Sequence, residues 1–329
     1  MKIIVGYIIL LLLLLSSCEK KGNSFNSEIR YISQFRTTRY LKGEKLSYIQ
    51  NIGIYGCDIC YPYLLLNLGR QDSLVGIYDV EKKIFLDNMF TLGMGPNEFS
   101  SFVITQQYKD SVLVINDVHK QEISLVNLFE SVRSHNVKFL KKISYEGMHE
   151  MVFYTDSLLW MKDVKQNRIS YICSDSLHPS QILYKEKISG SDLNHFLLLA
   201  DAIKPDATKL VTLSGVLNQI DILSLDSDIG KNFSVTTSPE MIRVSDLQES
   251  GYTDAFDYFL SIPRCNDDYI MVLHVSSETQ KKHLYMIDWE GNGIADYIVN
   301  EDLVDFCVDW KHHVIYGVTA DEEVYVYEK

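Results

Sequence analysis

Two cysteines separated by two residues, Cys57-Asp-Ile-Cys60, form the spacing in this chain that most directly suggests chemistry. A redox-active pair needs its first cysteine at the N-terminus of a helix, where the thiolate is stabilised. The residues that follow, Tyr61 to Leu66, have the composition of a strand. A local disulfide or a buried pair is therefore expected. A structural zinc site would need a second pair of ligands, and the sequence has no other C-x-x-C.

The histidines and acids suggest no compact site. His312 and His313 are adjacent, and neighbouring side chains on a strand point to opposite faces, which argues against a shared metal ion. A hairpin turn is expected there instead. The paired acids also fall where turns are expected: Asp226 with Asp228, and Asp267 with Asp268. The sequence thus predicts no catalytic residues, no protein metal centre and no cofactor. It leaves open a calcium ion held by carbonyls and carboxylates in a central channel.

The elements that must position these residues are short strands. Runs of apolar, β-branched and aromatic residues alternate with polar turns, as in Leu74–Val80 followed by Ile84–Leu86. Such hairpins recur roughly every 40 to 55 residues, a period typical of four-stranded propeller blades. We therefore predict an all-β fold, a six-bladed β-propeller with four-stranded antiparallel blades, with seven blades as the alternative. Helical turns are expected only in Ser191–Ala202 and Ser245–Phe259.

The last hairpin unit lacks an outermost strand before Lys329. An N-terminal stretch, Ile29–Ile32 or Leu46–Ile49, is expected to supply it and so close the ring. Closure removes most of the exposed strand edges.

The N-terminus resembles the signal of a bacterial lipoprotein. Lys2 precedes an apolar run from Ile3 to Leu15, which is shorter than the roughly 20 residues of a membrane span. Ser16-Ser17-Cys18 then has the form of a lipobox, which implies a lipid on Cys18. We expect a signal peptide over 1–17, a lipidated tether over 18–27 and a single propeller domain over 28–329.

Three local sequences carry a resemblance to six-bladed TolB-like or NHL-like propeller lipoproteins of Bacteroidetes. Leu92–Phe99 resembles their Gly-x-Gly-Pro-x-Glu-Phe segment and is the specific motif. Lys204–Val211 resembles the Pro-Asp-Gly-x-Lys turn, except that Ala207 replaces the glycine, and Ile287–Asn292 resembles an Asp-x-x-Gly-Asn hairpin. The resemblance implies a fold and a location in the envelope, and no known activity.

The first motif has a structural explanation. Gly93 and Gly95 permit positive φ, Pro96 stiffens the turn, and Phe99 can fasten the crossover to the next blade; Glu98 completes the motif. A phosphate cradle would need a following helix, and no strong helical pattern follows. The three tryptophans have two explanations, a sugar-binding face or blade core. Trp160 is expected in the core, and Trp289 and Trp310, at turns, are candidates for exposure.

Charge and composition limit the partners. The net charge of −13 argues against nucleic acid as a partner and against electrostatic docking on anionic lipid. The chain is therefore expected to bind the membrane through the lipid on Cys18. We interpret the chain as a non-enzymatic binding or scaffold module for an envelope protein or glycan. It would be anchored in the bacterial envelope, at the outer membrane, and Glu19-Lys20-Lys21 slightly favours a periplasm-facing position. The alternative is a propeller enzyme, a sugar lyase or lactonase-type hydrolase, for which His, Asp, Glu or Arg from at least three blades must converge at one channel mouth.

Overall fold

The computed structural model describes residues 28–69, 72–109, 111–147, 152–155, 158–163, 168–173, 176–182, 199–214, 218–225, 232–238 and 257–328. Cys18, the lipidation site predicted above, lies outside these residues. No helix among the described residues is long and apolar enough to cross a membrane.

Antiparallel sheets follow one another along the chain. The first contains β4 (Ile54–Cys60), β5 (Tyr63–Leu68), β6 (Ser73–Asp79) and β7 (Ile84–Thr91), and the second contains β8 (Val103–Tyr108), β9 (Val112–Asp117), β10 (Glu122–Asn127) and β11 (Phe139–Ser144). The third contains β12 (Val152–Thr155), β13 (Leu158–Asp163), β14 (Arg168–Cys173) and β15 (Ser176–Ile182). Next come β16 (Leu199–Ile203), β17 (Lys209–Ser214), β18 (Gln219–Ser224) and β19 (Phe233–Thr236), and then β20 (Tyr258–Cys265), β21 (Tyr269–Val275), β22 (Lys282–Asp288) and β23 (Gly293–Val299). The chain ends with β24 (Leu303–Asp309), β25 (Val314–Thr319) and β26 (Val324–Glu328).

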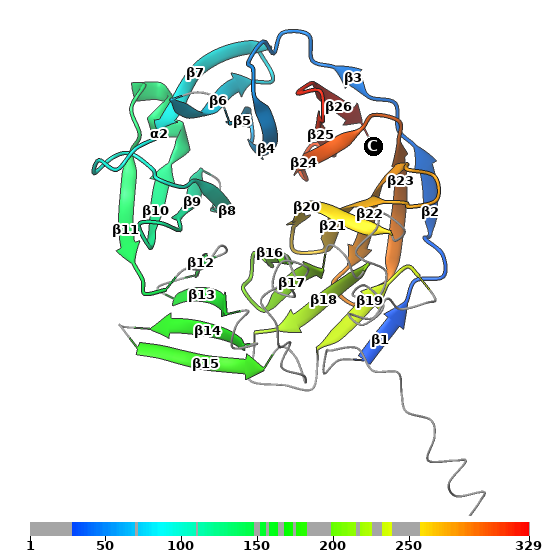
Figure 1. Ribbon diagram of the computed structural model, residues 1–329. Coiled ribbons are helices and arrows are strands. Elements are labelled where there is room, and N and C mark those ends of the chain that lie inside the picture. Colours follow the sequence, from blue (N-terminus) through cyan, green and yellow to red (C-terminus); the bar gives the residue numbers. More distant parts are fainter. Residues whose placement is uncertain are drawn as a thin grey trace, which may run out of the picture.

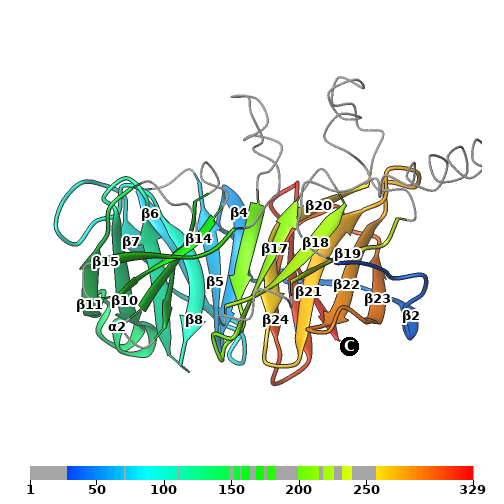
Figure 2. The same cartoon turned by 90° about the horizontal axis from the view of Figure 1, so that it is seen from below.

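These sheets stand as blades around a central axis, with the first strand of each sheet nearest the centre (Figure 1). Figure 2 shows the same ring from the side, with the blades standing next to one another. The fold is therefore all-β, with a propeller arrangement of four-stranded antiparallel blades. Five of these blades are described with side chains in every strand, and not the six that were predicted. The sheet β12–β15 is the exception, because only the backbone pairing of β14 and β15 is described.

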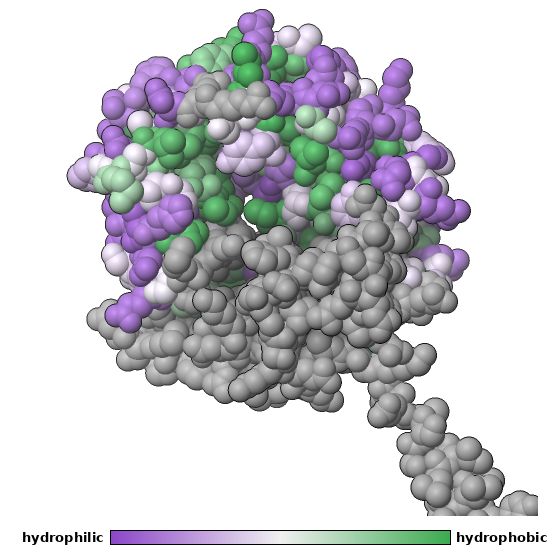
Figure 3. Space-filling model, in the orientation of Figure 1, coloured by the Kyte–Doolittle hydropathy of each residue, from purple (hydrophilic) through white to green (hydrophobic). Residues whose placement is uncertain are grey.

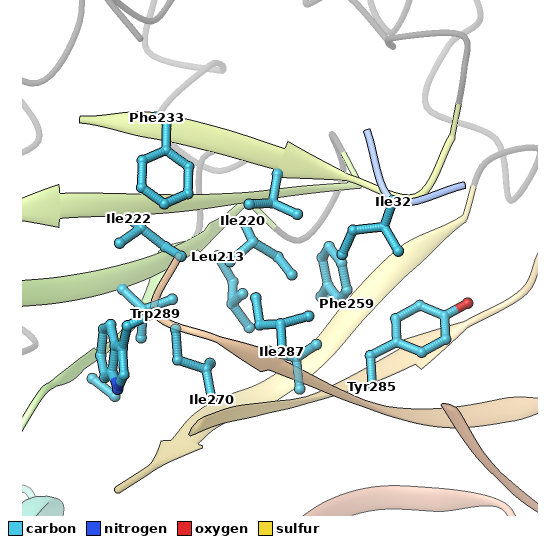
Figure 4. Close-up of a cluster of buried hydrophobic side chains, with 14 residues drawn as sticks. Ile32, Leu213, Ile220, Ile222, Phe233, Phe259, Ile270, Tyr285, Ile287 and Trp289 are labelled. Atoms are coloured by element: carbon cyan, nitrogen blue, oxygen red, sulfur yellow. The ribbon is translucent and has the colours of Figure 1, made fainter. Parts of the chain in front are cut away.

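Apolar side chains fill the spaces between neighbouring blades. Between β16–β19 and β20–β23, Ile220 and Ile222 belong to one cluster with Ile270 and Ile287, all at most 1 % exposed (Figure 4). Each such strand is covered on both faces, which explains why its residues are continuously apolar rather than alternating.

The N-terminal segment closes the ring. β3 (Glu44–Lys45) pairs with β26 and is the outermost strand of the last sheet. The amide of Leu46 continues the pairing by donating to the carbonyl of Val324 at 2.8 Å. Of the two predicted stretches, the one beginning at Leu46 is adjacent to the closing strand.

The other predicted stretch has a different position. β1 (Glu28–Tyr31) pairs in parallel with β19, and β2 (Thr37–Tyr40) pairs in parallel with β23. Two sheets therefore have five strands rather than the four predicted. The segment passes along the outside of three sheets (Figure 1) and covers outer edges that would otherwise expose unpaired amides and carbonyls.

One short helix was not predicted. α2 (Leu128–Ser134) follows β10 directly, with the side chain of Asn127 accepting a hydrogen bond from the amide of Glu130. The helix ends at His135, which has a left-handed conformation with φ of 52°. The cap and the acidic third residue are signals of a helix start that the strand periodicity obscured.

The turn after β16 suggests a stabilising substitution. Ala207 has φ of 58°, in the region that favours glycine, and it occupies the glycine position of the turn that Lys204–Val211 resembles. This conformation costs an L-residue about 1–2 kcal/mol in steric strain, while glycine loses about 0.5–1 kcal/mol in backbone entropy on folding. Ala207→Gly is therefore expected to raise the free energy of unfolding by about 0.5–1 kcal/mol in urea denaturation. Ala202→Gly, within β16, is the control and should lower it; a loss of stability in both variants would contradict the prediction.

Candidate functional site

A cavity of about 570 Å³ lies in the channel, toward the C-terminal ends of the inner strands. Its lining comes from five sheets, through residues at the ends of β4, β8, β16, β20 and β24. Figure 3 views the ring along its axis and shows a hollow at its centre, with hydrophobic side chains along part of its border. The lining residues are Asp58, Ile59, Ile104–Lys109, Leu113, Ala202, Ile203, Pro205, Ile262–Asp267, Cys307, Val308 and Trp310.

Irregular pairing in the inner strands shapes this region. In β20 the register shifts between Leu260 and Arg264, and Ile262 and Pro263, which lie within this bulge, line the cavity. A second bulge between Ile104 and Gln106 of β8 contains Thr105, which also lines it. Bulges redirect side chains and are frequent next to functional sites.

A buried ion cluster joins three inner strands beside the cavity. Arg264 of β20 donates from Nη1 to Oδ1 of Asp58 in β4 at 2.6 Å. Its Nη2 lies 3.5 Å from both carboxylate oxygens of Asp305 in β24. The side chains of the three residues are 12–16 % exposed. We call Asp58, Arg264 and Asp305 the seam cluster, because it spans the junction of the first, fifth and last sheets.

Backbone contacts complete the seam cluster. Arg264 also donates from Nε to the carbonyl of Phe306 at 2.8 Å and from Nη2 to the carbonyl of Cys57 at 2.9 Å. Its guanidinium is therefore occupied by the protein itself. This arrangement is a structural tie between blades.

Asp305 connects the bulges of three strands. It accepts hydrogen bonds from the amide of Cys57 at 2.8 Å and from the hydroxyl of Ser261, which has φ of 67°. A Cβ added at Gly56 would lie 2.7 Å from Oδ2 of Asp305. Glycine is thus required where β4 approaches this carboxylate.

Two members of the seam cluster, Asp58 and Arg264, have shifted pKa values. Burial raises the pKa of Asp58 to about 6, an effect that the nearby Arg264 opposes only in part. Burial also lowers the pKa of Arg264, but the carboxylates of Asp58 and Asp305 outweigh it, so the net shift is upward and the guanidinium stays charged.

The cysteines whose side chains the structure describes form no disulfide. Cys57 and Cys60 are at most 1 % exposed, and they belong to clusters on opposite faces of their blade. Of the two structures expected for the C-x-x-C, a local disulfide is therefore wrong, and the residues are buried thiols that do not pair with each other. Burial raises the pKa of Cys265 to about 12 and also raises that of Cys307. These thiols, which line the cavity, are protonated at neutral pH and weak as nucleophiles.

The glycine motif makes a turn held by Glu98. The carboxylate of Glu98 accepts a hydrogen bond from the amide of Gly95 at 2.7 Å, and a Cβ at Gly93 would lie 2.1 Å from it. Gly93 has φ of 157°, and Gly95 has no positive φ, so the predicted need for positive φ at Gly95 is wrong. Close approach to Glu98 explains both glycines better than conformational freedom does.

The rest of this motif packs between the first two sheets. The carbonyl of Pro96 accepts from the ammonium of Lys142 at 2.5 Å. Phe99 is 2 % exposed and contacts the rings of Phe90, Phe102 and Phe139. The structure places the motif at the crossover from β7 to β8 and outside the cavity lining.

The two turn tryptophans differ. Trp289 is 2 % exposed and donates from Nε1 to the carbonyl of Asn266 at 2.9 Å, so its predicted exposure is wrong (Figure 4). Trp310 is half-buried and lines the cavity. Trp160 is buried, as predicted.

The paired histidines lie in the turn between β24 and β25, with His312 bonded through Nδ1 to Asp309 at 2.7 Å. Within the described part of the chain, no group of three or more His, Cys, Asp or Glu could hold a metal ion.

The residues of the seam cluster come from sequence positions 58, 264 and 305, and no local spacing connects them. Sequence reasoning found no candidate there, although the isolated Arg264 in an apolar strand was a usable signal.

Comparisons with known proteins identify the fold. No family model matches the chain, and no curated protein matches it. A member of the DUF4221 family from Bacteroides vulgatus has 9 % identity and a TM-score of 0.52, with 92 % of this chain and 96 % of that chain covered. The β-propeller domain of Cps50 (Swd1) from Myceliophteria thermophila has 9 % identity and a TM-score of 0.52, with 88 % and 100 % covered. A calcium-binding protein, regucalcin, from Agrobacterium tumefaciens has 11 % identity and a TM-score of 0.46, with 89 % and 95 % covered. The two likenesses with a TM-score of 0.52 show a β-propeller.

Proposed function

We propose that this chain is a lipid-anchored binding module of the bacterial cell envelope, with the mouth of the channel cavity as its recognition site. In this proposal a lipid on Cys18 anchors the chain at the outer membrane. The propeller faces the periplasm, and its partner is a protein or a glycan. We also propose that β12–β15 is a sixth blade, supported by its four-stranded backbone pairing. The observation that carries the function is the cavity of about 570 Å³, within the range of small-molecule and recognition sites.

The chemistry of the lining supports binding rather than catalysis. Asp, Arg and Asp side chains from three sheets do converge in the seam cluster, which is the arrangement required for the enzyme alternative. However, the Arg264 guanidinium is held by Asp58 and by backbone carbonyls, and no histidine is among the lining residues that the structure describes. The thiols in the lining are protonated and weak as nucleophiles.

The protonation of Asp58 is a second observation that favours the enzyme. The carboxyl pKa of about 6 suits a general acid or base, and Asp58 lines the cavity. Its carboxylate is already bonded to Arg264 and to the side chain of Asn67, so proton transfer would first require those bonds to break. Binding therefore remains the better supported function.

Affinity purification of the lipidated chain from detergent-solubilised membranes, followed by mass spectrometry, tests the proposal. A stoichiometric partner is expected with the wild-type chain, and Cys18→Ser should move the protein to the soluble fraction. Lys109→Glu reverses an exposed charge at the cavity and should reduce recovery of the partner at least tenfold. Lys281→Glu is the matched control, because Lys281 is also exposed and also lies over a tyrosine ring, away from the cavity. Equal recovery with both variants, or no partner at all, would overturn the proposed site.

A further inference from the structure

Branched aliphatic side chains form one part of the wall of the cavity. Ile59, Ile104, Ile203 and Ile262 come from the inner strands of four different sheets and all line it. Ile104 and Ile203 are buried, whereas Ile59 and Ile262 are half-buried and retain accessible surface. They give the wall an apolar part, which can remove apolar ligand surface from water.

The charged groups of the lining balance one another. Asp58 and Asp267 are opposed by Lys109 and Arg264, so the formal charges cancel. Asp58 and Arg264 are also bonded to each other. Lys109, Asp267 and the amide of Gln107 are exposed at the ends of the inner strands. A ligand with a net charge gains little here, whereas a neutral polar group can bond at the exposed end.

The aromatic content of the lining is small. Tyr108 and Trp310 are the aromatic residues of the described lining, and both are half-buried. Trp289, at the neighbouring turn, is buried and bonded to a carbonyl. A sugar ring stacks on open aromatic faces, and the half-buried rings of Tyr108 and Trp310 offer little such surface.

We propose that this cavity binds the apolar body of a small neutral amphiphile, an aliphatic chain whose hydroxyl or amide head stays at the exposed end beside Lys109 and Asp267. The proposal rests on the proposed function as a binding module and names the chemical class of the ligand. The volume of about 570 Å³ is sufficient for such a molecule.

A homologous series of n-alkanols, from butanol to decanol, tests this on the purified full chain. Binding is followed through the fluorescence of Trp310, with Trp310→Phe supplying the background from the two other tryptophans. Each added methylene should strengthen binding about fourfold, until the chain fills the cavity and the gain stops. Affinity that does not change with chain length, or saturable binding of glucose in place of the alkanols, would overturn the proposal.

Cavity-filling variants locate the site. Ile262→Trp should abolish alkanol binding, and Ile59→Trp is a second variant on a different strand in case the first fails to fold. Ile84→Trp, on the exposed strand β7, is the control and should bind as the wild type does. Alkanol binding that survives in folded Ile262→Trp and Ile59→Trp would refute the site.

The two proposals can fail separately. Alkanol binding by the pure chain does not depend on an envelope partner. If alkanols bind but membranes give no partner, the proposed function fails while the ligand class stands. If a partner is captured and lost with Lys109→Glu but no alkanol binds, the function stands and the ligand class is wrong.

Discussion

Arg264→Met is expected to lower the free energy of unfolding by about 3–5 kcal/mol. The substitution keeps the length of the side chain but leaves the carboxylates of Asp58 and Asp305 close together without their shared cation. Removing one partner from a buried ion pair costs this much because a charge stays buried and uncompensated. The carbonyls of Cys57 and Phe306 also lose a donor. Urea denaturation at pH 7 measures the change.

Three further variants separate the seam cluster from a general loss of packing. Arg264→Lys keeps the charge but not the two-pronged geometry, so an intermediate loss is expected. Arg264→Met combined with Asp58→Asn should recover part of the stability, since one carboxylate instead of two then remains. Arg133→Met is the matched control, because Arg133 is 79 % exposed and its ion pair with Glu130 is 3.7 Å long; it should change stability by less than about 0.5 kcal/mol. A similar loss for Arg264→Met and Arg133→Met would show that the seam cluster is not a tie between blades.

The strands could be predicted because the forces that form them are local. The run Val112–Val118, for example, is rich in β-branched residues, short and followed by a polar turn, and the structure has a strand over Val112–Asp117. The repeated spacing of such runs indicated blades, since a sheet covered on both faces reads as continuously apolar. An N-terminal closing strand could be predicted because an incomplete last unit needs an edge partner, but of the two stretches expected, Leu46–Ile49 only adjoins that strand and Ile29–Ile32 pairs elsewhere.

The seam cluster could not be predicted, because it depends on contacts between residues far apart in the sequence. Asp58, Arg264 and Asp305 meet through register shifts in β4, β20 and β24, and no local pattern reveals a bulge in an apolar strand. The same limit applies to Trp289. It follows a strand at a polar turn, yet it packs against the neighbouring sheet. Sequence position indicated a turn, whereas burial was determined by the next blade.

Asp58 is expected to make the protein less stable as the pH rises from about 4 to 6. Its pKa is about 6 in the folded chain and about 3.8 in the unfolded chain, so the folded state holds the proton more tightly. A carboxyl group whose folded pKa is raised contributes stability below its unfolded pKa, and that contribution is lost as the pH rises through the folded pKa. A shift of about two pH units corresponds to roughly 3 kcal/mol.

Comparison with Asp58→Asn isolates this effect from the other titrating groups. Burial lowers the pKa of His274, so this group makes stability rise with pH and partly masks Asp58 in the wild type. Hydrogen bonds lower the pKa of Asp257, whose contribution rises with pH below about pH 4. The difference in unfolding free energy between wild type and Asp58→Asn cancels these contributions. It should fall by roughly 3 kcal/mol between pH 4 and 6 and stay level above pH 7. A difference that rises with pH would mean that Arg264 stabilises the ionised carboxylate more than burial opposes it, and the seam cluster would then hold a fully charged pair at every pH where the protein is folded.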